Sequence, residues 1–132
     1  MQSVKKKAIT DSIVKSNQTF ANALLHSQIQ THVYHLQTRS FAKHKALEVF
    51  YNSIGDLLDK YIETFQGKYS ILDKYRGIDI DNNPENCIAY LTGLMNINNN
   101  TKLGVYDSDL DNIKVEINEL INQTIYKLKN LK

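Results

Sequence analysis

The chain has no tryptophan, one cysteine and one proline among its 132 residues. The lone Cys87 excludes an internal disulfide and any metal site built from cysteine pairs, so a cytoplasmic protein is the expectation. No window approaches the roughly 18 uncharged apolar residues of a membrane-spanning helix, and no apolar signal-peptide core follows Lys5-Lys6-Lys7. A net charge of +2 is too small to imply a nucleic-acid or membrane partner by itself. We therefore expect no membrane partner.

The composition is otherwise typical of one globular domain, with 42% hydrophobic and 23% charged residues. Residues 1–132 are predicted to form a single domain. In it, residues 1–16 are a basic N-terminal arm or an extra helix, and residues 17–132 are the bundle. The abundance of Asn, Ile and Lys is typical of an AT-rich microbial or phage genome, so the expected location is a host cytoplasm or, for a phage protein, the virion.

Two helices are predicted in the first half of the chain. Apolar positions recur at helical spacing in residues 17–36. One apolar stripe there consists of Leu25, Ile29, His32 and Leu36. Ser40 can cap a second helix, whose apolar period continues to Gly67. The break at residues 37–40 contains neither Gly nor Pro, so one unbroken helix is an open alternative.

The second half is predicted to contain a crossover connection and two further helices. Residues 68–83 are predicted to form an irregular connection, in which residues 69–75 could make a short amphipathic helix across the bundle. Asn83-Pro84-Glu85 starts a short helix that reaches about Asn96. Ser108 is predicted to cap a last, long helix. The predicted fold is therefore all-α, a four-helix bundle with a crossover between its second and third helices.

Metal-ligating side chains gather on one face of the second helix and near the end of the first. They are His32, His44, Glu48, Asp59 and Glu63. A hairpin would bring His32 close to His44, with Glu48 one turn away, but Asp59 lies roughly 22 Å further along the helix. A twofold dimer would place the histidines of one subunit against the Asp59 and Glu63 carboxylates of its mate. Such mixed ligands suit ferrous iron, manganese or zinc.

These residues also carry a family resemblance. The sequence Gln30-Thr31-His32, with Phe41, His44, Glu48, Asp56, Asp59, Glu63 and Gly67, resembles the ferroxidase signature of the Dps family, the mini-ferritins named as DNA-binding proteins of starved cells. The resemblance covers residues 25–67. It implies a ferritin-like bundle in which His32, His44 and Glu48 of one subunit, with Asp59 and Glu63 of the mate, bind and oxidise ferrous iron. It also implies peroxide or oxygen as oxidant and a shell of usually twelve subunits that stores ferric mineral.

Two other functions stay open. Lys5, Lys6 and Lys7 form a basic arm of the kind through which some members of the resembled family bind DNA. A structural assembly protein, phage-encoded and without ferroxidase activity, is the second alternative. His26 and His35 have no matching partner and are predicted to be structural. Phosphoryl and acyl transfer have no candidate motif, since neither a phosphate-binding glycine loop nor a nucleophile elbow occurs.

Overall fold

The computed structural model describes residues 3–77 and 79–132. In these residues the chain forms the helices α1 (Val4–Gln37), α2 (Phe41–Lys68), α3 (Cys87–Asn100) and α4 (Ser108–Asn130), with the short 3-10 turn η1 (Pro84–Asn86) before α3. No β-strand occurs in this part of the chain, which confirms the predicted all-α fold class. None of the described helices is long and apolar enough to cross a membrane.

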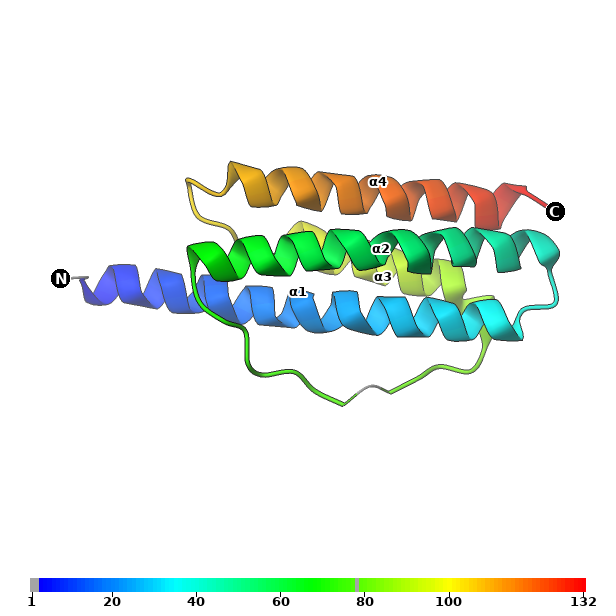
Figure 1. Ribbon diagram of the computed structural model, residues 1–132, viewed down its shortest axis with the longest axis horizontal. Coiled ribbons are helices and arrows are strands. Elements are labelled where there is room, and N and C mark those ends of the chain that lie inside the picture. The colour runs from blue at the N-terminus through cyan, green and yellow to red at the C-terminus, as the bar shows by residue number, and fades with distance from the viewer. Residues whose placement is uncertain (1–2, 78) are drawn as a thin grey trace.

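The four helices pack side by side around one core. α1 contacts α2 and α3, and α4 contacts the same two helices, so each helix has two neighbours (Figure 1). The side chains that are completely shielded from solvent include Phe20, Leu24, Leu47, Phe50, Ile54, Leu91, Leu110, Ile117 and Ile121. Each contributes about 1.5–3 kcal/mol when it leaves water. Because all four helices supply such residues, the bundle shares a single hydrophobic core.

Residues 4–16 belong to α1 and form neither a separate arm nor an extra helix, which corrects the predicted start of the first helix at residue 17. Ser3 caps α1 by accepting a hydrogen bond from the Lys6 amide at 3.2 Å. No Gly or Pro interrupts the sequence from Val4 to Gln37, so nothing ends the helix earlier. The beginning of α1 projects beyond the rest of the bundle (Figure 1).

The predicted break between the first two helices is confirmed, and the alternative of one unbroken helix is wrong. Thr38 has an extended backbone that ends α1. Ser40 caps α2 as expected, because its hydroxyl accepts a hydrogen bond from the Lys43 amide at 3.2 Å. The two helices therefore form an antiparallel hairpin whose turn lies at one end of the bundle (Figure 1).

The apolar stripe at residues 25–36 of α1 lies mostly outside the core, and of its four residues only Leu25 packs against the core. Leu36 is 69% exposed and Ile29 is 45% exposed, and His32 is exposed as well. The buried face of α1 includes the polar residues Ser27 and Thr31, whose hydroxyls donate to the carbonyls of Leu24 and Ser27. Hydropathy alone misplaces the core because these hydroxyls are satisfied by the helix backbone itself.

The connection from α2 to α3 is irregular, as predicted, and the short helix considered at residues 69–75 does not form. We call residues 69–77 and 79–83 the strap. Polar side chains four residues apart on α1 hold it: Gln18, Asn22, His26 and Gln30. The Gln18 amide oxygen accepts from the Lys74 N–H at 2.9 Å, and Gln30 exchanges two 2.8 Å hydrogen bonds with the Asp81 backbone. The strap thus follows α1 toward the end of the bundle where α3 begins (Figure 1).

The last two helices start almost where the sequence predicts. Asn83 accepts a hydrogen bond from the Glu85 amide, which confirms the predicted helix start there. α3 extends to Asn100, four residues beyond the predicted end. At α4 the N-cap residue is Asp107 rather than Ser108. The Asp107 carboxylate makes no capping bond because it is used by the preceding turn.

Candidate functional site

Four aromatic rings gather beside the turn between α1 and α2. The rings of His35 and His44 are stacked with their centroids 3.6 Å apart. His32 stacks on Tyr51 of α2 at 4.1 Å, and its ring lies 5.8 Å from that of His35. The hairpin therefore brings His32 and His44 into one cluster, with His35 between them.

Reciprocal hydrogen bonds fix the tautomers of the stacked pair. His35 Nδ1 lies 2.7 Å from the carbonyl oxygen of His44, and His44 Nδ1 lies 2.8 Å from the carbonyl oxygen of His35. A carbonyl oxygen only accepts, so Nδ1 carries the proton in both rings. In the neutral imidazoles Nε2 then holds a lone pair. This is the usual arrangement of a metal-binding histidine, whose second nitrogen donates to a carbonyl or carboxylate.

The two Nε2 atoms differ in their surroundings. The Tyr51 hydroxyl lies 3.5 Å from Nε2 of His35, at the limit of a hydrogen bond. Nothing in the described part of the chain is hydrogen-bonded to Nε2 of His44, and that residue is only half-buried. His44 is consequently the histidine of the cluster best placed to bind something from outside the chain.

The predicted carboxylates lie along the outer side of α2. Glu48 is half-buried one turn from His44 and pairs with Lys45 Nζ at 3.3 Å. Asp59 and Glu63 are exposed, and neither forms an ion pair within the described residues. They remain about four and about five turns of helix, respectively, from His44. Within the described chain, no three His, Cys, Asp or Glu side chains come close enough to hold a metal.

His26 has a structural role, as predicted. Its Nδ1 lies 2.6 Å from the Tyr90 hydroxyl, and its Nε2 donates to the carbonyl of Asp79 at 2.6 Å. Both ring nitrogens are thus occupied: Nε2 holds the strap, and Nδ1 accepts from the Tyr90 hydroxyl of α3. His35 and Tyr51, by contrast, belong to the cluster but were absent from the predicted ligand set. The signal that points to His35 is its position: it precedes the turn by about as many residues as His44 follows it.

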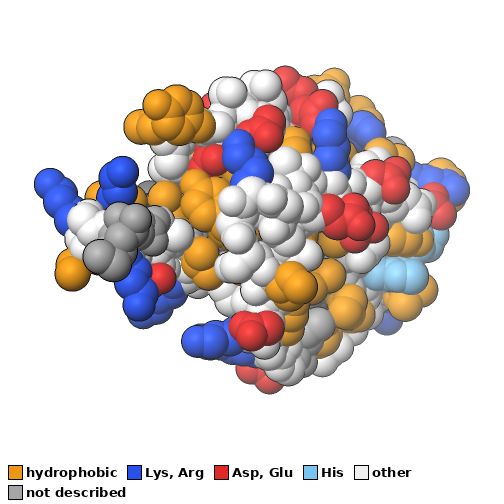
Figure 2. Space-filling model, turned by 60° about the vertical axis from the view of Figure 1, so that its left-hand side comes forward, with side chains coloured by type: hydrophobic (Ala, Val, Ile, Leu, Met, Phe, Trp, Pro, Cys, Tyr) orange, Lys and Arg blue, Asp and Glu red, His pale blue; other side chains and the backbone are white. Residues whose placement is uncertain are grey.

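Exposed apolar side chains surround this outer side of α1 and α2. Besides Ile29 and Leu36, they include Phe41 at 75% exposure and Val49 at 44%. Histidine side chains lie beside hydrophobic ones on the surface in Figure 2. Scattered apolar residues are ordinary on a protein surface, but several of them around unpaired polar ligands are typical of an interaction face.

A second charged feature lies at the other end of α1. Lys5, Lys6 and Lys7 are all exposed, and Lys and Arg side chains gather around the projecting helix start in Figure 2. The first turn of α1 contains no acidic residue. Positive charge at a helix N-terminus is unfavourable because that end carries the positive pole of the helix dipole. A bound anion would relieve this repulsion.

Comparison with known proteins relates the chain to a family. The sequence profile of a family of unknown function (DUF5856) matches residues 35–128, which is more than two thirds of the chain. The matched segment includes His35, His44, Glu48, Asp59 and Glu63, whereas His32 lies outside it. No curated protein and no solved structure matches the chain.

Proposed function

This chain belongs to the DUF5856 family of unknown function, and from its own side chains we propose that it is a Dps-like ferroxidase and iron-storage protein. Its substrate is ferrous iron, which is oxidised at a site shared between two subunits. One subunit supplies His32, His44 and Glu48, and its twofold mate supplies Asp59 and Glu63.

The hydrogen bond from His44 Nδ1 to the His35 carbonyl carries this proposal. It directs the free Nε2 lone pair away from the backbone, and no hydrogen-bond partner for it occurs among residues 3–77 and 79–132. A histidine held in this tautomer by a carbonyl is prepared for a metal ion. The stacked His35 ring keeps the imidazole of His44 in one orientation, so little conformational entropy is lost on binding.

A second copy of the chain supports the rest of the site. Asp59 and Glu63 lie too far along α2 to meet His44 of the same chain. An antiparallel arrangement of two α2 helices brings them to the histidines of the mate and creates two equivalent sites. Ile29, Leu36, Phe41 and Val49 would be covered by the same contact. The strap, which spans the distance between α2 and α3, supports a ferritin-like topology for each subunit.

The chemistry follows from the ligand set. Imidazole and carboxylate together suit ferrous iron, with manganese and zinc as competing ions. Two ferrous ions lose one electron each, and one molecule of hydrogen peroxide accepts both electrons and two protons to give two waters; oxygen would accept four electrons from four ferrous ions. The protein contributes ligand geometry and negative charge, which favours the ferric product over the ferrous substrate.

Glu63→Gln tests the proposal with little risk to the fold, because Glu63 is exposed and forms no ion pair with any residue that the structure describes. The matched control is Glu119→Gln, an exposed glutamate on α4 whose loss changes the net charge equally. We expect peroxide consumption that depends on ferrous iron to fall at least tenfold in Glu63→Gln and to be unchanged in Glu119→Gln. Equal rates in both variants and the wild type would contradict the ferroxidase proposal and favour a structural assembly protein.

DNA binding is a second candidate function, favoured by the three exposed lysines at the positive end of the α1 dipole. Replacement of Lys5, Lys6 and Lys7 by glutamine should abolish binding of duplex DNA, and wild-type affinity should fall steeply with salt. Binding that persists unchanged in the triple variant would exclude this role of the helix start.

A further inference from the structure

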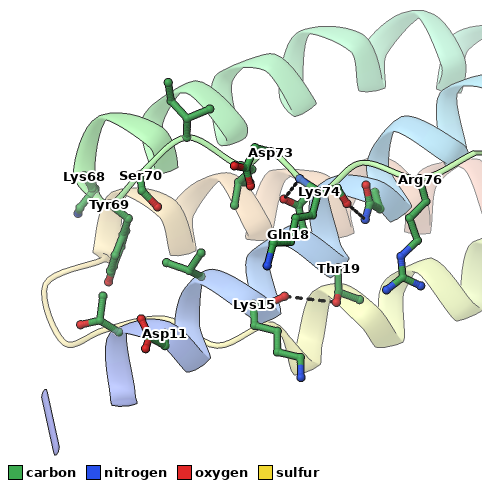
Figure 3. Close-up of a pocket in the computed structure, with 15 residues that line it drawn as sticks. Asp11, Lys15, Gln18, Thr19, Lys68, Tyr69, Ser70, Asp73, Lys74 and Arg76 are labelled. Atoms are coloured by element: carbon green, nitrogen blue, oxygen red, sulfur yellow. Dashed lines mark hydrogen bonds between the residues drawn. The ribbon is translucent and has the colours of Figure 1, made fainter. Parts of the chain in front are cut away.

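An open cleft lies between the first half of α1 and the beginning of the strap (Figure 3). Its volume is about 1020 Å³, enough for a small organic molecule. Val14 and Leu72 supply apolar walls, and polar side chains line the rest. The cleft is separate from the histidine cluster, because its α1 residues end at Asn22, ten residues before His32.

One buried donor points to what the cleft accepts. The amide oxygen of Gln18 takes the Lys74 N–H, but its Nε2 is buried and donates to no protein atom in the described residues. Buried polar groups in proteins are nearly always hydrogen-bonded, so an orphaned donor calls for an acceptor from outside the chain. A ligand oxygen beside Gln18 would satisfy it.

The charges around Gln18 favour a negatively charged acceptor. Lys15 extends from α1 and Arg76 from the strap toward the same side of the cleft (Figure 3), and Lys74 lies beside Gln18. No carboxylate among the described residues is paired with these three cations. An arginine and two lysines with an amide donor form the kind of set that binds phosphate oxygens.

The acidic residues of the cleft do not neutralise the positive charge of Lys15, Lys74 and Arg76. Asp11 lies at the end opposite Arg76 (Figure 3). Lys68 lines the Asp11 end too, but it is held by Asp107 at 3.1 Å and Asp109 at 2.7 Å. Asp73 is the one strap carboxylate in the lining, and three cations outweigh it. The cleft is therefore polarised along its length.

We propose that this cleft binds a phosphorylated small molecule. The phosphate lies against Lys15, Gln18 and Arg76, and the organic part packs on Val14 and Leu72. This function is independent of the iron site, which no residue of the cleft approaches.

Isothermal titration calorimetry of the full chain with ATP, in buffer free of metal ions, tests the inference. Tripolyphosphate and adenosine are separate arms that carry only the charge or only the base. We expect ATP to bind at micromolar concentration, tripolyphosphate more weakly and adenosine least. Absence of heat for all three up to millimolar concentration would overturn the proposal. Equal binding of tripolyphosphate and ATP would contradict the claim that the organic part of the ligand contributes to binding. Equal binding of adenosine and ATP would contradict the proposed phosphate site.

Two variants locate the binding. Arg76→Gln should weaken ATP binding at least tenfold, whereas Arg39→Gln, at the only other arginine, should leave it within twofold. Gln18→Glu keeps the oxygen that accepts the Lys74 N–H but replaces the orphaned donor by a negative oxygen, so it should abolish binding. Its control is Gln123→Glu on the exposed side of α4. Equal losses of ATP affinity in each variant and its control would contradict the site, because they would mean that ATP binding depends only on the net charge of the protein.

Discussion

Replacing Gly104 by alanine should break the network that joins the end of α2 to the turn before α4. A Cβ at this position would lie 2.8 Å from the Tyr69 hydroxyl and 3.2 Å from Oδ2 of Asp107. Those two groups are hydrogen-bonded to each other, and the Gly104 N–H donates to the same carboxylate oxygen at 2.7 Å. The Tyr69 ring is stacked on Phe65 at 4.7 Å, so it has little room to move.

The magnitude follows from the bonds at risk. A hydrogen bond to a charged group contributes about 1.5–3 kcal/mol, and we expect Gly104→Ala to cost about 2 kcal/mol through the Tyr69 contact. For a domain of this length that corresponds to a fall in Tm of roughly 6–10 °C. Gly93→Ala is the matched control, because a Cβ there meets nothing within 4 Å and lies inside α3. It should stabilise the protein by about 0.5–1 kcal/mol through helix propensity.

Thermal unfolding followed by circular dichroism measures both variants. The Tm should fall in Gly104→Ala and rise slightly in Gly93→Ala. An unchanged Tm in Gly104→Ala would refute the reasoning, because it would mean that the Asp107 network tolerates displacement without loss.

The pH dependence provides a further check on the same network. Burial alone would raise the pKa of Asp107, but hydrogen bonds from Tyr69 and Gly104 and the nearby Lys68 ammonium lower it below its usual range. A carboxylate with a lowered pKa contributes stability that is complete above its unfolded pKa of about 3.9 and is lost as pH falls. The difference in Tm between wild type and Gly104→Ala should thus be constant around neutral pH and become smaller as the pH falls into the acid range.

Two other predictions concern Tyr69 and the strap. Burial, with the hydrogen bond to Asp107, raises the pKa of Tyr69 to about 12. The stability that the neutral Tyr69 side chain contributes is therefore complete below the unfolded pKa of about 10 and is lost as the pH rises from there through the folded pKa. Urea unfolding should show that Tyr69→Phe loses less stability than the wild type between pH 9 and 11.5, and equal losses would disprove this. Gln30→Ala removes two hydrogen bonds to the Asp81 backbone worth about 1 kcal/mol each, so the Asp81 amide should exchange hydrogen more than tenfold faster. Unchanged exchange would show that other contacts hold the strap.

The helices themselves were predictable because local signals are strong. Ser40 and Asn83 cap helices where the sequence places them, and α2 ends one residue beyond the predicted Gly67. The sequence underestimated α1 because the apolar residues in 4–16 are few and only Ile13 among them is buried, although nothing there breaks a helix. Its extent is set by propensity and a serine cap.

The strap and the core face of α1 could not be predicted from hydropathy. Gln18, Asn22 and Gln30 look like surface residues, yet their side chains bind the backbone of a segment some fifty residues away. The available signal was a row of polar side chains at four-residue spacing, which His26 completes between Asn22 and Gln30. Ser27 and Thr31 are buried for a similar reason, since their hydroxyls bond to the helix backbone and need no solvent.

For the candidate site, the sequence correctly predicted which of the site residues come together within one chain and which stay apart. His32 and His44 fall in one cluster, while Asp59 and Glu63 stay far along α2, as helical rise requires. The position of His35 before the turn was a signal for its place in the cluster, but its stacking on His44 was not predictable, because stacking depends on the detailed geometry of the turn. The iron itself stays a prediction.

The most direct test of the shared site is to mix two inactive variants. His44→Gln and Asp59→Asn chains, each inactive alone, would be unfolded together, refolded, and assayed for ferrous oxidation by peroxide. A heterodimer of the two has one site with both defects and one intact site, so random pairing restores about a quarter of wild-type activity. That recovery is the predicted result. No recovery, from variants that fold and pair normally, would contradict a site built from two subunits.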